Sequence, residues 1–233
     1  MTKVPFDRDA AAARVATLLL DIQAVHFNAQ TPYIFTSGWA SPVYIDCRKV
    51  ISFLDARREI IALGAAQLSN VIDIDAVDYI AGGETAGISY AAWLSETLSK
   101  PMLYVRKKPK GFGRNARIEG SFPEGARVLL VEDLATDGAS KVSFADALRE
   151  AGAEVSDVFS VFFYGIYPES AQILGDAGLS LHALCTWRDV LAEARRRESF
   201  APEVLAEVES FLAQPAVWSA AHGGATARST ASA

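Results

Sequence analysis

The segment Val128-Leu-Leu-Val-Glu-Asp-Leu-Ala-Thr-Asp-Gly-Ala-Ser140 decides the fold, because an apolar run is followed by two acids and a loop of small residues. Val128 to Val131 form a continuous apolar run, which is typical of a strand buried on both faces of a parallel sheet. The loop after Asp133 leads into a predicted helix over residues 140–151. Ligands of open α/β sheets bind beyond the carboxyl ends of the strands, so this segment also predicts a binding site.

Strand-like and helix-like segments alternate around this stretch. We predict strands over 76–81, 102–106, 127–131, 155–163 and 179–184, with helices over 54–68, 86–98 and 140–151. The alternation predicts an α/β fold, in which a mainly parallel central sheet is flanked by helices. Towards the N-terminus, apolar residues at helical spacing from Val15 to Val25 predict an amphipathic helix, and Tyr33 to Cys47 predicts two short strands.

The C-terminal part of the chain continues this pattern and then changes character. Thr186 and Asp189 have the spacing of a capping box, and Pro202 opens what we predict to be the last helix. After Pro215 the chain is rich in Ala, Ser, Thr and Gly, which predicts a disordered tail over 215–233. We therefore predict a single domain over 1–214, with a small hood built from residues 1–50 and C-terminal elements.

Composition narrows the classes of function. The net charge of −6 argues against a general nucleic-acid partner, which would need a positive surface. Cys47 and Cys185 lie far apart, and the three histidines do not cluster, so we expect no structural zinc and a reducing, cytoplasmic location. No apolar run approaches the roughly 20 residues that cross a bilayer, so we expect no membrane association.

The loop after the central strand suits a phosphate group. Backbone N–H groups from Ala135 to Ser140, the positive end of the following helix and the hydroxyls of Thr136 and Ser140 all favour an anion. Glu132 and Asp133 then stand where sugar hydroxyls would be bound. The same pattern also fits a plain strand-to-helix turn whose acids are solvated.

A second signal is the basic segment from Arg106 to Arg117, which holds six of the 22 Lys and Arg residues. Pro109, Gly111 and Gly113 disfavour a helix, so the segment predicts a basic loop that can close over a pyrophosphate. A solvated charge run is the alternative. A nucleic-acid surface is disfavoured, because Phe112 is the only aromatic residue in the loop.

Three segments carry a family resemblance. Residues 128–140 resemble the phosphoribosyl pyrophosphate (PRPP) motif of type I phosphoribosyltransferases. The basic loop, with Ile118-Glu-Gly120, resembles the catalytic loop of orotate phosphoribosyltransferases, and Ser37-Gly-Trp-Ala-Ser-Pro-Val-Tyr-Ile-Asp46 resembles their base-site segment. The resemblance, over roughly 31–165, implies a glycosyltransferase that converts PRPP and orotate to orotidine 5-phosphate and pyrophosphate in pyrimidine biosynthesis. It implies Mg²⁺ carried by the donor without a metal site on the protein, and a homodimer that shares its catalytic loops.

The resemblance also assigns roles to residues. It makes Lys110, Glu132 and Asp133 catalytic and gives the pyrophosphate loop as Gly83, Glu84 and Thr85. The orotate site is assigned to Ser37, Gly38, Tyr44, Ile45 and Thr136, although Tyr44 and Ile45 also fit plain core positions. The donor site comprises Arg106, Lys107, Lys110, Glu132, Asp133, Leu134, Ala135, Thr136, Asp137, Gly138, Ala139 and Ser140.

The chain departs from the family pattern at several positions. Phe112 replaces a histidine, while Thr36 and Ala86 replace lysines. Asp137 would stand beside a phosphate, so its side chain must point away or cap the helix. No arginine follows the strand near Tyr164, where some relatives bind the orotate carboxylate. The sequence therefore constrains the identity of the base less than it constrains the identity of the phosphoribosyl donor.

Two alternatives therefore stay open, a phosphoribosyltransferase for another base and a regulator that binds PRPP without catalysis. The second is opposed by the intact cations of the basic loop and by the lack of a helix-turn-helix segment before the domain.

Overall fold

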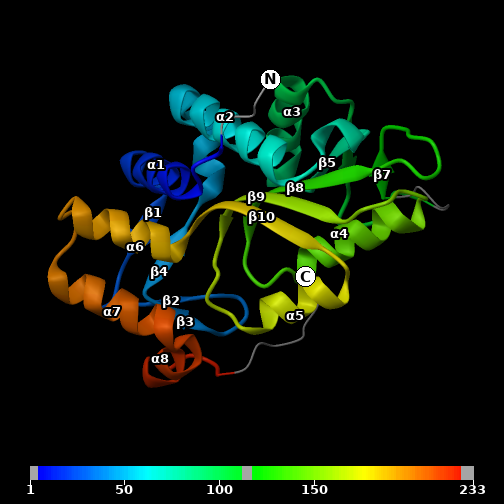
Figure 1. Ribbon diagram of the computed structural model, residues 1–233. Coiled ribbons are helices and arrows are strands. Elements are labelled where there is room, and N and C mark those ends of the chain that lie inside the picture. Colours follow the sequence, from blue (N-terminus) through cyan, green and yellow to red (C-terminus); the bar gives the residue numbers. More distant parts are fainter. Residues whose placement is uncertain (1–4, 112–116, 227–233) are drawn as a thin grey trace.

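The computed structural model describes residues 5–111 and 117–226 (Figure 1). Two 3₁₀ turns, η1 (Cys47–Ser52) and η2 (Ile74–Ala76), accompany the helices and strands. The helices are α1 (Arg8–Asp21), α2 (Leu54–Val71), α3 (Ala86–Leu98), α4 (Ala139–Glu150), α5 (Glu169–Asp176), α6 (Trp187–Arg196), α7 (Pro202–Ala213) and α8 (Pro215–Ala221). The strands are β1 (Val25–Phe27), β2 (Tyr33–Ile34), β3 (Ala40–Ser41), β4 (Val43–Ile45), β5 (Tyr79–Gly83), β6 (Met102–Val105), β7 (Ile118–Glu119), β8 (Val128–Ala135), β9 (Asp157–Phe163) and β10 (Ser180–Thr186).

The central sheet has the order β10-β9-β8-β5-β6-β7. All neighbouring strands pair in parallel except β7, which pairs antiparallel with β6. Helices cover both faces of the sheet (Figure 1), so the predicted α/β class with a mainly parallel sheet is confirmed. Because the parallel strands run in one direction, the loops that leave β5, β6, β8 and β9 emerge at the same edge of the sheet.

Alternating residues of β8 serve two different cores. Leu129 and Val131 pack with α1, α2, α3 and the N-terminal strands, whereas Val128 and Leu130 pack with α4. This period-two alternation is what a strand buried on both faces requires. It also places the next two residues, Glu132 and Asp133, on opposite faces of the sheet.

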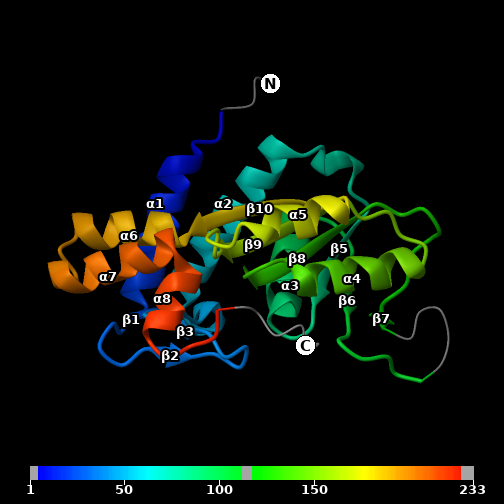
Figure 2. The same cartoon turned by 90° about the horizontal axis from the view of Figure 1, so that it is seen from below.

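A hood lies at one end of the sheet (Figure 2). In it β1 pairs antiparallel with β4, and β2 pairs antiparallel with β3. Helix α8 lies against β3, and α7 packs on both α6 and α8. Tyr90 on α3 donates a 2.8 Å hydrogen bond to the carbonyl of Cys47, which joins the turn η1 to the body.

The predicted disordered tail is wrong as far as residue 226. Helix α8 begins at Pro215, and Trp218 is buried with its ring edge against Phe211. The Ser219 hydroxyl accepts a 3.0 Å hydrogen bond from the Ala40 N–H and donates a 2.6 Å bond to the Ala225 carbonyl. The small residues that suggested disorder instead permit close packing, because a Cβ at Gly224 would lie 2.3 Å from the Ala40 nitrogen.

Other differences concern element boundaries. Strand β8 continues to Ala135 instead of ending at Val131, and Val25 belongs to β1 instead of the first helix. Helix α5 and strand β7 were not predicted. The Thr186–Asp189 capping box is confirmed, and Gly152 has a positive φ of 101° just after α4. Within the described ranges, no helix combines the length and apolar character that a membrane span needs.

Candidate active site

The predicted functional segments meet at the carboxyl edge of the sheet. Strand β5 leads into Glu84 and Thr85, β6 into Arg106 and Lys107, and β8 into the loop before α4. The strands β6, β5 and β8 are direct neighbours, so three loops from separate parts of the sequence share one side of the fold.

Glu132 is an acid buried on the α4 face. It is 6% exposed, and its Oε2 lies 3.6 Å from the Nζ of Lys141 on α4. Burial raises the pKa of Glu132 to about 7, although the Lys141 charge acts to lower it. Its Oε1 packs against Gly83, where a Cβ would lie 1.7 Å away. Gly83 thus leaves the space that the Glu132 carboxylate occupies.

Asp133 faces the opposite side, towards α3 and η1. Burial raises its pKa, while the charges of Lys141 and Arg48 and the backbone N–H groups of Leu134 and Asp133 act to lower it. Burial raises the pKa values of Cys47 and Tyr90, and the nearby Asp133 charge raises them further. The sequence predicted that the strand ends before these two acids, but β8 continues through them to Ala135, so they lie within the strand and face opposite sides of the sheet.

Residues Thr136 to Gly138 connect β8 to α4, whose first residues are Ala139 and Ser140. The Asp137 Oδ1 accepts a 3.0 Å hydrogen bond from the Ala139 N–H, so this acid caps the helix as expected. Gly138 has φ +93°, and a Cβ there would meet Leu174 at 2.9 Å, so both backbone and space require glycine. Ser140 is exposed, Thr136 is half-buried, and Ala135 is fully buried within the strand.

The pyrophosphate and basic loops are linked by Glu84. Its backbone N–H bonds the Val105 carbonyl at 2.9 Å, and its Oε2 accepts a 2.7 Å bond from the Lys107 N–H. Arg106 directs its guanidinium to Glu119 at 3.3 Å, and its Nε has no hydrogen-bond partner within 5–111 and 117–226. Thr85, Lys107 and Lys110 are exposed, while Phe112 lies outside the described residues.

The predicted orotate residues divide into two groups. Ser37 and Gly38 form the turn between β2 and β3, where the Gly38 carbonyl accepts a 2.8 Å bond from the Ala225 N–H. Tyr44 is half-buried, lies 5.5 Å from the Tyr33 ring and accepts a 3.3 Å hydrogen bond from Arg48. Ile45 is 3% exposed within the main core, the alternative that the sequence also allowed, and its assignment to the orotate site stays a prediction. Adjacent strand residues face opposite sides, and Ile45 takes the inner one.

A chain of contacts connects the hood to the phosphate loop. The Trp39 ring lies edge-on to Tyr167, 5.5 Å between centroids. The Ser170 N–H bonds the Tyr167 carbonyl at 3.1 Å, and the Ser170 hydroxyl reaches the Thr136 carbonyl at 3.5 Å. The base-site segment and Thr136 are thus joined by a chain of packed contacts.

Lys141 is a site residue that was not predicted from the sequence. This lysine is 5% exposed and lies under the phosphate loop, with its Nζ 3.1 Å from the Ser140 hydroxyl. One signal in the sequence pointed to it. Lys141 shares the helical spacing of Phe144, Ala145 and Leu148, the buried stripe of α4, and a lysine on such a stripe requires a partner.

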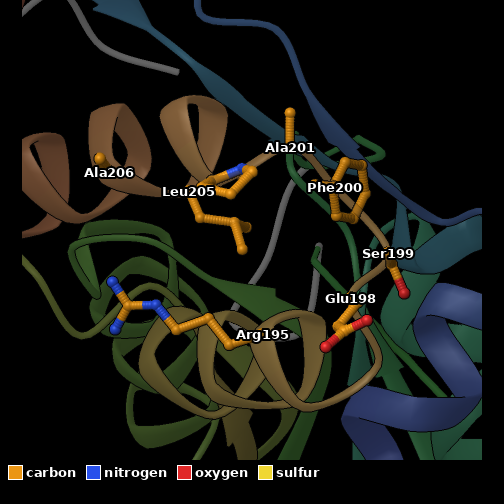
Figure 3. A pocket seen from close by; sticks show the side chains of 8 residues that line it. Arg195, Glu198, Ser199, Phe200, Ala201, Leu205 and Ala206 are labelled. Atoms are coloured by element: carbon orange, nitrogen blue, oxygen red, sulfur yellow. The ribbon is translucent and has the colours of Figure 1, made fainter.

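A cavity of about 730 Å³ lies elsewhere, between α6 and α7 (Figure 3). Phe200 and Leu205 provide its apolar lining, and the guanidinium of Arg195 is paired with Glu209 at 2.5 Å. None of the residues predicted to bind donor or base lines this cavity. PRPP carries several phosphate charges, whereas the cation Arg195 that lines this cavity is already neutralised by Glu209. The chemistry of the cavity therefore does not suit PRPP.

A parallel sheet with an acid pair and a phosphate-type loop on its central strand, beside a basic loop, defines the chain as a type I phosphoribosyltransferase. Orotate phosphoribosyltransferase from Roseobacter denitrificans is 52% identical over 216 residues, which are 93% of this chain and 96% of the relative. A second, from a Ruegeria species, is 55% identical over 89% of this chain and 92% of the relative. The chain belongs to the orotate phosphoribosyltransferases.

Solved structures agree with this membership. Orotate phosphoribosyltransferase from Aeropyrum pernix has a TM-score of 0.67 at 28% identity, covering 80% of this chain and 99% of that one. UMP synthase from Leishmania donovani has a TM-score of 0.75 at 26% identity, covering 88% of this chain and 43% of that larger one. A scan against family models found no match.

Proposed function

We propose that this chain carries out the reaction of its family, in which the phosphoribosyl group of PRPP is transferred to orotate, through the residues at the carboxyl edge of the sheet. The observation that carries the proposal is the convergence there of three sets of groups, each with a different chemical character. The loop after β8 is suited to a phosphate, the acids of β8 to sugar hydroxyls, and the cations after β6 to a pyrophosphate.

The donor is held from three sides in this proposal. The loop from Thr136 to Ser140 binds the 5-phosphate at the start of α4, where the helix dipole favours an anion. Asp133 and Glu132 accept hydrogen bonds from ribose hydroxyls. Thr85 and Lys107 bind the pyrophosphate. Both residues are exposed, and the hydrogen bond between the Lys107 N–H and Glu84 joins their two loops.

The difficult step is the departure of pyrophosphate from C1 while positive charge develops on the ribose ring. Orotate N1 attacks the opposite face of C1, and Lys110 stabilises the charge on the leaving group. Arg106 contributes by exchanging Glu119 for a pyrophosphate oxygen. Lys110 is exposed on the segment that follows β6, which suits a contact made after the donor has bound.

Magnesium fits this site as an ion carried by the donor. Within residues 5–111 and 117–226, no three acidic, histidine or cysteine side chains gather to hold a metal, and the two acids of β8 face opposite sides. When bound to the donor, magnesium would neutralise charge on the pyrophosphate. Calorimetry should find weak magnesium binding to the protein alone and tight binding once PRPP is present, and tight binding to the protein alone would contradict the proposal.

The function is tested by following the absorbance of orotate in the presence of PRPP and magnesium. Orotate should exceed uracil, adenine, hypoxanthine and xanthine in kcat/KM by orders of magnitude, because unpaired polar groups in a closed site are costly. A purine in first place would overturn the assigned base and leave the donor chemistry intact. Lys110→Ala should lower kcat and leave PRPP affinity of the free enzyme nearly unchanged, with Lys100→Ala at the other end of β6 as the control.

We also propose a homodimer in which each basic loop serves the neighbouring site, and a reducing cytoplasm as its location. The exposed Lys107 and Lys110 on a loop at the sheet edge support the first part, and the free buried thiols of Cys47 and Cys185 support the second. Mixing Lys110→Ala with Asp133→Asn subunits should restore activity in heterodimers. Demonstrated subunit exchange without restored activity would mean that the loop acts within its own subunit.

A further inference from the structure

A buried lysine with an incomplete set of partners lies under the phosphate loop. Lys141 is 5% exposed and contacts the Oε2 of Glu132 at 3.6 Å and the Ser140 hydroxyl at 3.1 Å. The other Glu132 oxygen, Oε1, is buried and has no hydrogen-bond partner among the residues that the structure describes. Neighbouring side chains on α4, such as Phe144 and Leu148, are apolar and provide none of the missing bonds.

Stability does not explain this arrangement. Removing two charges from water costs several kcal/mol per ion unless the pair is closely bonded and fully satisfied. A separation of 3.6 Å with one unsatisfied oxygen does not meet that condition. A methionine at the position of Lys141 would fill the same space without desolvating a charge. The lysine is therefore better explained by its place next to the phosphate loop.

The direction of the hydrogen bond between Lys141 and Ser140 indicates what the lysine does. An ammonium group can only donate, so the Ser140 oxygen is the acceptor in its bond with Lys141. The hydroxyl hydrogen of Ser140 is then free to point outwards from an exposed residue, as a donor to an anion. Lys141 also adds a positive charge to the first turn of α4, where the helix dipole is already positive.

We propose that Lys141 is a positioning residue for the donor: it holds the Glu132 side chain beside Gly83 and orients the Ser140 hydroxyl towards the 5-phosphate. The inference rests on the proposed function and extends it to a residue that does not touch the substrate. Lys141 thereby positions two groups that contact PRPP, whereas the exposed cations after β6 contact PRPP themselves. Loss of Lys141 should allow Glu132 to protonate more readily, because the Lys141 charge acts to lower the pKa of that acid.

The test compares Lys141→Met with Lys141→Arg and with Lys100→Met, a matched control whose Nζ bonds the Asp75 carbonyl at the far edge of the sheet. Lys141→Met should weaken PRPP binding and raise its KM by about 10- to 100-fold, as expected for a lost charged hydrogen bond. The acid limb of the pH profile of kcat/KM for PRPP should move to higher pH. Lys141→Arg should recover most of both properties, and Lys100→Met should match the wild type.

Unchanged PRPP affinity and an unchanged acid limb in Lys141→Met would overturn the inference, as would a loss of thermal stability without either change. If Lys141→Met does not fold, the double variant Lys141→Met/Glu132→Gln removes the unpaired charge. That variant should fold and show no acid limb from Glu132, whereas an acid limb like that of the wild type would again overturn the inference. Failure of the wild type itself to bind PRPP or to consume orotate would refute the proposed function instead.

Discussion

Replacing Gly83 with alanine should test the close packing at the centre of the site. An ideal Cβ at this position would lie 1.7 Å from the Glu132 Oε1 and 2.7 Å from the Phe144 Cε2. The Glu132 carboxylate has little room to retreat, because Lys141 and the buried face of α4 surround it. The backbone of Gly83 does not have a positive φ, so the effect comes from crowding alone.

Overpacking of this kind costs about 1–3 kcal/mol. For a domain of this size each kcal/mol lowers Tm by roughly 2–4 °C, so Gly83→Ala should melt about 2–12 °C below the wild type. Displacement of Glu132 should also raise the KM for PRPP. Gly175→Ala is the control, because a Cβ there meets nothing within 4 Å and the residue lies in α5. Its Tm should stay level or rise.

A second variant decides whether Glu132 is the group that is crowded. Shortening this acid in Gly83→Ala/Glu132→Asp removes the atoms nearest to the added methyl group, so Tm should recover towards that of the wild type. Activity should stay low, because the carboxylate no longer reaches its position. A Gly83→Ala protein that melts with the control, or a double variant that melts lower still, would refute the crowding argument.

Two further predictions concern the hood and the pH dependence of stability. Ser219→Ala leaves the buried Ala40 N–H without its partner, so denaturant melts should show a loss of about 1–3 kcal/mol, and the KM for orotate should rise more than that for PRPP. The exposed Ser210→Ala is its control, and equal behaviour of the two would contradict the role of this bond. The pKa of Glu132 is raised to about 7 from 4.5, so the folded state keeps a proton that the unfolded state has released. The free energy of unfolding should therefore fall as pH rises from about 4.5 to 7, and a slope that Glu132→Gln leaves unchanged would refute this assignment.

Local patterns were sufficient for the class of fold and for the place of the site. The alternation of strands and helices, the apolar run of Val128 to Val131 and the Thr186–Asp189 capping box are properties of residues close together in sequence. Strand direction then fixes which loops share an edge, so the meeting of the loops after β5, β6 and β8 follows from the order of elements. The clustering of positive charge after Val105 in an acidic chain was visible in the same way.

Only the tertiary structure decided the details that depend on distant partners. The tail from Pro215 looked unable to bury enough surface, yet Ser219 finds the Ala40 N–H 179 residues away and becomes fully buried. The extension of β8 through Glu132 and Asp133 comes from pairing with β9, which separates two acids that are adjacent in sequence onto opposite faces. Whether Lys141 is solvated or held under the loop likewise depends on Glu132 and on the packing of α4. Propensity and periodicity describe a residue and its near neighbours, whereas these outcomes depend on which surfaces meet when the chain folds.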